Sequence, residues 1–136
     1  HVELIKMGSL CEQAITLSSR ALLGDEKSQV EQVYSVDGEI DKQEREIENS
    51  CMRLLLLQRP FASDLRKISA ALKMISDMER IGDQASDIAD MVPYIRFSEA
   101  KSKVHIEAMA KATVKMVTDS VDAFVQDDLD LALGIF

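Results

Sequence analysis

The 136-residue sequence has few of the residues that interrupt helices or that are typical of other fold classes. It contains five Gly, two Pro, two Tyr, four Phe and no Trp, which argues against a collagen-like, sheet-rich or disordered chain. Hydrophobic residues make up 46% of it and charged residues 29%. This composition and length indicate one domain-sized, all-α bundle with a core of its own.

Long apolar runs and basic clusters are missing as well. The longest apolar run, Leu54–Leu57, is far shorter than the ~20 residues of a membrane-spanning helix, so no membrane insertion is expected. The net charge is −8 without a run of basic residues, so nucleic acid is not an expected partner. Cys11 and Cys51 have neither a CxxC spacing nor a neighbouring His. They are expected to be reduced core thiols, which points to the cytoplasm.

Apolar residues recur at steps of three and four along most of the chain, as they do on one face of a helix. Leu54, Phe61 and Leu65 lie on these stripes and are expected to face inward. The pattern predicts a first helix over 2–23 and a second, antiparallel helix that ends at a break over 58–60. A third helix is predicted from Phe61 to Val92, a fourth from a cap at Ser98, and a fifth from a cap at Asp127.

The fourth predicted helix resembles the first when the two are laid over each other. At one constant offset the identical pairs are Met7 with Met109, Thr16 with Thr118, Ser18 with Ser120, Ala21 with Ala123, and Asp25 with Asp127. This similarity predicts a three-helix repeat over 1–92, a linker over 93–102, and the truncated start of a second repeat over 103–136. Because the chain begins with His1 and stops within a pattern, we expect the natural protein to be longer.

Four acidic residues are expected to meet between the second and third helices. If these helices fold back at Pro60, Asp37 stands level with Asp83, and Asp41 stands level with Glu79. Within each helix the two acids are four residues apart and therefore share a face. Clustered carboxylates repel one another, so they require either bound cations or raised pKa values.

Oxygen ligands suit Mg²⁺, Ca²⁺ or Mn²⁺, and iron and zinc remain open, because inward carboxylates on a helical bundle are a known iron scaffold. Asp37, Asp41, Glu79 and Asp83 are thus candidate metal ligands. The alternative is a solvated acidic seam that is neutralised by Arg45 and Arg80.

The sequence gives less support to an enzymatic function. A carboxylate-bridged oxidase or metal-storage bundle is an alternative, but His105 lacks the Glu three residues earlier that an ExxH motif requires. His105 also lies too near a helix start for a phosphotransfer histidine, and the sequence has no Gly-rich phosphate loop or nucleophile elbow. We therefore expect no enzyme activity.

Three stretches closely resemble the PhoU family of phosphate-signalling proteins. They are the first acidic motif over 37–41, the turn Gln58-Arg59-Pro60-Phe61 with its continuation to Ile68, and the second acidic motif over 78–85. The resemblance covers most of residues 2–92, and 103–136 resembles the start of the family's second repeat.

The resemblance implies a metal-cluster site at Asp37, Asp41, Glu79 and Asp83. It also implies a cytoplasmic, often dimeric adaptor between the ATPase of a phosphate ABC transporter and a sensor histidine kinase. Such an adaptor keeps the phosphate-starvation response off when phosphate is plentiful. The second acidic site of the family pattern is absent from this sequence.

Overall fold

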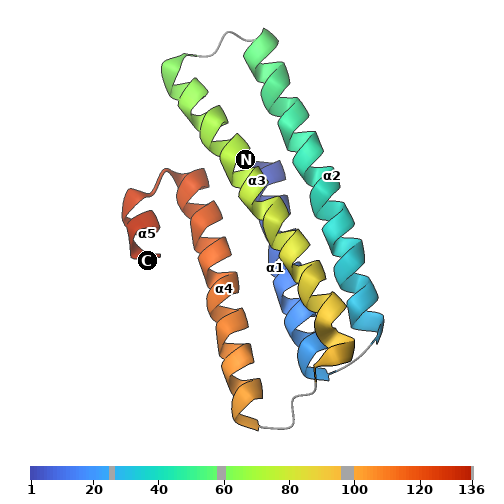
Figure 1. Ribbon diagram of the computed structural model, residues 1–136. Coiled ribbons are helices and arrows are strands. Elements are labelled where there is room, and N and C mark those ends of the chain that lie inside the picture. The colour runs from blue at the N-terminus through green and yellow to red at the C-terminus, as the bar shows by residue number, and fades with distance from the viewer. Residues whose placement is uncertain (25–26, 58–60, 96–99, 136) are drawn as a thin grey trace.

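The computed structural model describes residues 1–24, 27–57, 61–95 and 100–135. Its elements in chain order are α1 (Val2–Gly24), α2 (Lys27–Leu57), α3 (Ala62–Met91), the 3-10 helix η1 (Val92–Tyr94), α4 (Ala100–Gln126) and α5 (Leu129–Gly134). The four long helices run alternately up and down (Figure 1). The predicted all-α helical bundle is therefore confirmed.

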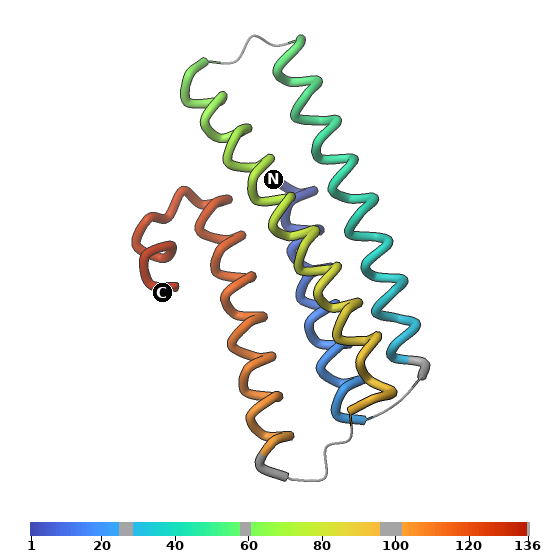
Figure 2. The backbone as a smooth tube through the Cα atoms, viewed as in Figure 1, coloured from blue at the N-terminus to red at the C-terminus, as the bar shows by residue number. Residues whose placement is uncertain are grey.

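The core lies where α1, α2 and α3 meet. Its most deeply buried large side chains are Met7, Cys11, Val33, Ile40 and Ile75. Removing such a side chain from water contributes roughly 1.5–3 kcal/mol. Helix α1 packs against α2, α3 and α4, so it is the central element of the molecule (Figure 2).

Helix α4 packs along α1 and buries Val117 and Val121. The approach is close at Gly8, where an added Cβ would lie 3.1 Å from Cγ2 of Val121. An added methyl group on α1 would therefore require Val121 of α4 to move by a few tenths of an ångström. The division of the chain into one complete and one incomplete repeat stays a prediction.

The turn between α4 and α5 corrects one predicted cap. Asp128, rather than Asp127, caps α5, because its carboxylate accepts a hydrogen bond from the Leu131 amide at 2.9 Å. Asp127 instead ends α4 with a φ of 54°, in the left-handed region that a C-terminal helix motif requires. Its amide donates to Phe124, and the next amide donates to Ala123 at 2.9 Å. The predicted cap at Ser98 and the break at 58–60 lie outside the described residues.

The end of the α2–α3 hairpin extends past α1 and α4 (Figures 1 and 2). Leu54, Phe61 and Leu65, which were expected to face inward, are therefore 39%, 81% and 45% exposed. The prediction was wrong for these three residues because the helical period of the sequence continues beyond the point where the neighbouring helices end.

Both cysteines are buried free thiols, as predicted. The Cys11 thiol donates to the carbonyl of Met78 at 3.4 Å, and its burial raises its pKa to about 12. Such a thiol is an unreactive core group. No helix in the described part of the chain combines the length and apolarity that a bilayer crossing requires.

Candidate metal centre

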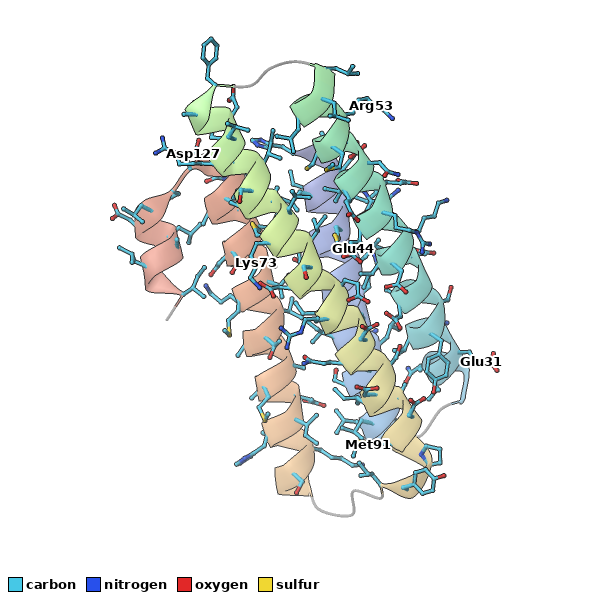
Figure 3. All side chains as sticks on the ribbon, turned by 45° about the horizontal axis from the view of Figure 1, so that its top comes forward. Glu31, Glu44, Arg53, Lys73, Met91 and Asp127 are labelled. Carbon is cyan, nitrogen blue, oxygen red and sulfur yellow. The ribbon has the colours of Figure 1, made fainter. Side chains whose placement is uncertain are left out.

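Five carboxylates from two helices converge between α2 and α3. Asp37, Asp41 and Glu44 come from α2, whereas Glu79 and Asp83 come from α3. Oxygens of Asp37, Asp41 and Asp83 lie within 4.8 Å of one another, and so do oxygens of Asp41, Glu44 and Glu79. We call these five residues the acid cluster. Figure 3 labels Glu44, which is the last member of the cluster along α2.

All four sequence-predicted ligands therefore lie in one place. The two groups share Asp41, which puts this carboxylate at the middle of the cluster. Asp37, Asp41 and Glu79 are half-buried, while Asp83 is exposed at the rim. Asp37 faces the interior of the bundle because it lies on the same face of α2 as the buried Val33 and Ile40.

The carboxylate of Asp37 is held from one side and unpartnered on the other. Ser86 of α3 donates its hydroxyl to Oδ2 of Asp37 at 2.7 Å. Oδ1 of Asp37 and Oδ1 of Asp41 are buried, and neither has a hydrogen-bond partner among the described residues. A buried anionic oxygen without a partner is costly, so each of these atoms requires a proton or a cation.

Gly82 makes room for that arrangement. An added Cβ at this position would lie 2.8 Å from Oδ1 of Asp37 and 3.1 Å from Cδ1 of Ile40. Both distances are shorter than ordinary van der Waals contacts. The backbone of α3 thus approaches the carboxylate directly, which a larger residue would prevent.

Burial raises the pKa values of three members of the acid cluster, Asp37, Glu44 and Glu79. Burial, followed by the neighbouring Asp83 and Asp41, raises the pKa of Glu79 to about 7 from an ordinary value of 4.5. The pKa of Asp37 is raised mainly by burial, and the hydrogen bond from Ser86 opposes this rise. Burial also raises the pKa of Glu44. The cause common to all three is loss of water around a carboxylate.

The arginines expected to neutralise an acidic seam do not pair with the cluster. Nη1 of Arg80 lies 3.8 Å from Asp77, outside the cluster. Arg45 opposes the rise in the pKa of Glu44, but it is the weakest of the influences named there. Within the described ranges, no salt bridge reaches any of the five carboxylates. The arrangement therefore favours an added cation over internal neutralisation.

The cluster fits a hard cation. It offers carboxylate oxygens from two rigid helices, and two of these oxygens are buried without a partner. Hard divalent cations take such ligands, and a positive charge would offset the repulsion between the carboxylates. This donor set does not distinguish magnesium, calcium, manganese, iron or zinc.

Glu44 and the supporting Ser86 were not predicted from the sequence, which was searched only for acidic residues that stand opposite each other on the two helices. Glu44 has no acidic residue opposite it on α3, so it was not paired. A signal was present, because Glu44 shares the buried stripe of α2 with Asp37 and Ile40. His105, the residue considered for enzymatic alternatives, is exposed on α4 and is not part of the cluster.

Comparison with known proteins gives consistent matches. The family model described as "PhoU domain" matches residues 4–92. A phosphate-specific transport system accessory protein PhoU homolog from Clostridium acetobutylicum is 37% identical over 137 residues, covering 99% of this chain and 63% of the relative. The homolog from Pseudomonas aeruginosa is 34% identical, covering 97% of this chain and 55% of the relative.

A solved structure agrees with these sequence matches. The crystal structure of PhoU from Pseudomonas aeruginosa superposes with a TM-score of 0.86 at 34% identity, covering 98% of this chain and 65% of that chain. The present chain thus spans less than two thirds of the length of these relatives.

Proposed function

The chain belongs to the PhoU family, and on this premise we propose that it regulates phosphate uptake and phosphate-starvation signalling as a cytoplasmic, metal-binding adaptor. The family match and the names of the relatives, which are accessory proteins of the phosphate-specific transport system, support a role in phosphate transport. The proposed role is one of binding other proteins and not of catalysis.

The acid cluster is the observation that carries the metal-binding part of the proposal. Asp37, Asp41, Glu79 and Asp83 would supply the ligands, and Glu44 would complete the group around Asp41 and Glu79. When bound, a divalent cation would supply positive charge that lets these carboxylates stay ionised together. Ser86 would orient Asp37 by holding its second oxygen.

The proposed partners are the ATPase of a phosphate ABC transporter and a sensor histidine kinase, and the proposed assembly is a homodimer. Bound metal would join α2 to α3 across their facing surfaces. A joined hairpin presents its outer faces rigidly, which lowers the entropic cost of binding a partner. Residues 1–92 would form the repeat that carries the cluster, and 103–136 would begin the second repeat.

The regulatory role is tested in cells that lack the gene for this chain. Expression of a phosphate-starvation reporter in high phosphate should rise in the deletion strain and return to its low level when the wild-type gene is restored. The double variant Asp37→Asn with Asp83→Asn should restore repression poorly, whereas Asp87→Asn on the same helix should restore it fully.

Two results would contradict the proposal. Low reporter expression in the deletion strain would remove the regulatory role. Full repression by the Asp37→Asn, Asp83→Asn variant, at protein levels equal to wild type, would separate the acid cluster from regulation.

A further inference from the structure

The face of α2 that carries the acid cluster continues toward the start of the helix. Tyr34 precedes Asp37 by three residues and Asp41 by seven, so these side chains share one face of α2. On α3, Asp90 follows Ser86 by four residues and shares its face. We call the facing surfaces of α2 and α3 the seam. Tyr34 and Asp90 thus stand at the same end of the seam, about one helical turn beyond Asp37 and Ser86.

Tyr34 and Asp90 are joined across the seam. The hydroxyl of Tyr34 donates to Oδ1 of Asp90, just as the hydroxyl of Ser86 donates to Oδ2 of Asp37 at 2.7 Å. Among the residues that the structure describes, these are the two side-chain hydrogen bonds that link α2 to α3. The bond to Asp90 raises the pKa of Tyr34 above its ordinary value, so the phenol keeps the proton that it donates.

On the other side of the acid cluster, toward the end of the hairpin, the two helices are held by apolar packing. Ile47 and Cys51 of α2 are buried there, and Ile68 and Leu72 of α3 pack against the same core. Apolar attraction is non-directional, whereas a hydrogen bond favours a narrow range of distances and angles. The two hydrogen bonds therefore define the separation of α2 and α3 more narrowly than the apolar packing does.

The separation of these helices determines whether the acid cluster can hold a cation. Hard divalent cations bind carboxylate oxygens at about 2.0–2.6 Å, depending on the ion. Without a cation, the like charges on α2 and α3 repel one another, and no salt bridge in the described ranges offsets this repulsion. A site must be held within about 0.5 Å of its working geometry. A bond that keeps the seam closed in the metal-free chain therefore favours binding through preorganisation.

We propose that Tyr34 is a positioning residue of the acid cluster, which holds α2 and α3 at the separation that a hard divalent cation requires by donating to Asp90. The inference rests on the metal centre proposed above. Tyr34 does not touch the cation, and Asp90 is not a ligand, since it lies outside both groups of converging carboxylate oxygens. The bond acts before the cation arrives.

The substitution Tyr34→Phe tests this role because it removes the hydroxyl and keeps the ring. In titration calorimetry of the metal-free protein, the affinity for Mn²⁺ should fall about fivefold, less than the ~10–100-fold typical of groups that bond a metal ligand directly. The matched control is Tyr94→Phe. Tyr94 is the second of the two tyrosines in the chain, is 87% exposed, and should be replaceable without loss of affinity.

Unfolding in urea separates positioning from a purely structural role. A bond that only stabilises the fold would lower the stability of the metal-free and Mn²⁺-loaded proteins equally and would leave the affinity unchanged. Tyr34→Phe should instead lose more stability in saturating Mn²⁺ than in EDTA. The size of this difference should correspond to the loss of affinity seen by calorimetry.

A double-mutant cycle assigns the effect to the bond itself. Asp90→Ala removes the acceptor together with its charge, and Asp87→Ala, at an exposed acid on the same helix, measures the loss of charge alone. Asp90→Ala should weaken Mn²⁺ binding more than Asp87→Ala does. Tyr34→Phe should have no further effect in the Asp90→Ala background, because the bond is already lost there.

Two results would overturn the role given to Tyr34 while leaving the metal centre in place. One is equal Mn²⁺ affinity of the wild type, Tyr34→Phe and Tyr94→Phe. The other is a loss of affinity in Tyr34→Phe that persists in full in the Asp90→Ala background. Absence of Mn²⁺ binding by the wild type would remove the proposed metal centre, and this inference with it, so the two failures are distinguishable.

Discussion

At the scale of single residues, Gly82 determines how closely the backbone of α3 approaches the acid cluster. Its missing side chain leaves space for Oδ1 of Asp37, which is one of the buried oxygens that have no hydrogen-bond partner in the described chain. Ser86, one turn further along α3, holds the other oxygen. The geometry of one proposed ligand thus depends on two neighbours that are not themselves ligands.

Substituting Gly82→Ala should therefore weaken metal binding. The new methyl group would displace Oδ1 of Asp37, and changes in groups that orient a ligand typically cost about 10–100-fold in affinity. Titration calorimetry of the metal-free variants with Mn²⁺ measures this change. The matched control is Gly38→Ala on α2, where an added Cβ would meet nothing within 4 Å. Equal affinities in the two variants would contradict the role given to Gly82.

The raised pKa of Glu79 makes the metal-free protein sensitive to pH. Its pKa is about 7 in the fold and near 4.5 when unfolded, so the folded state binds more protons between these values. The free energy of unfolding should therefore rise as the pH falls from 8 to about 5.5. The raised pKa values of Asp37 and Glu44 act in the same direction.

Thermal unfolding in EDTA at several pH values measures this effect. Glu79→Gln should reduce the dependence of the melting temperature on pH, while Glu46→Gln, on the exposed side of α2, should keep it. A wild-type melting temperature that falls steadily between pH 8 and 5.5 would contradict the assigned protonation.

Sequence alone was sufficient to find most of the cluster. Asp37, Asp41, Glu79 and Asp83 could be predicted because helix periodicity and the position of one turn determine which residues stand level. Glu44, Gly82 and Ser86 could not be assigned in this way. Glu44 was identified by carboxylate oxygens within 4.8 Å of one another, Gly82 by the 2.8 Å that an added Cβ would leave, and Ser86 by a hydrogen bond of 2.7 Å. The spacing of residues along a helix does not determine such distances.

At the scale of elements, the α1–α4 contact depends on the close approach at Gly8. An added Cβ there would lie 3.1 Å from Val121 Cγ2, closer than an ordinary contact. Alanine is otherwise favoured over glycine within a helix by about 1 kcal/mol. The two effects have opposite signs, and they can be separated by changing the neighbour.

Gly8→Ala should be neutral or destabilising in the wild-type background and stabilising by about 0.5–1 kcal/mol in the background of Val121→Ala. The difference between the two backgrounds is the cost of crowding, roughly 1 kcal/mol. Urea unfolding of the four proteins measures it. Equal stabilisation by Gly8→Ala in both backgrounds would show that α4 does not approach α1 at this point.

The positions of the helices were easier to predict from the sequence than the burial of their side chains. The steps of three and four located the helices, and Val92–Pro93 marked the end of α3 within two residues. The same steps placed Phe61 and Leu65 in the core, which was wrong, because periodicity does not show how far the neighbouring helices extend. The cap of α5 was misplaced by one residue because Asp127 and Asp128 are both plausible caps in sequence.

At the scale of the whole molecule, the acid cluster lies on the α2–α3 hairpin, whose end is its most exposed part. The cluster lies between α2 and α3 near their middle, and the end of the hairpin extends past α1 and α4. The PhoU-domain match over residues 4–92 includes this hairpin, and the relatives it resembles are named accessory proteins of the phosphate-specific transport system. We expect metal binding to stiffen the hairpin without changing the topology of the bundle.

The most direct test of the account is the metal content of the purified protein. The chain is prepared without chelator, exchanged into metal-free buffer and measured by mass spectrometry of its elements, beside Asp37→Ala with Asp83→Ala and a control, Asp64→Ala with Asp87→Ala. We predict at least one metal ion per chain in the wild type and the control, and a loss of most of it in the first variant. Equal metal content in all three proteins would contradict the assignment of the acid cluster as a metal centre.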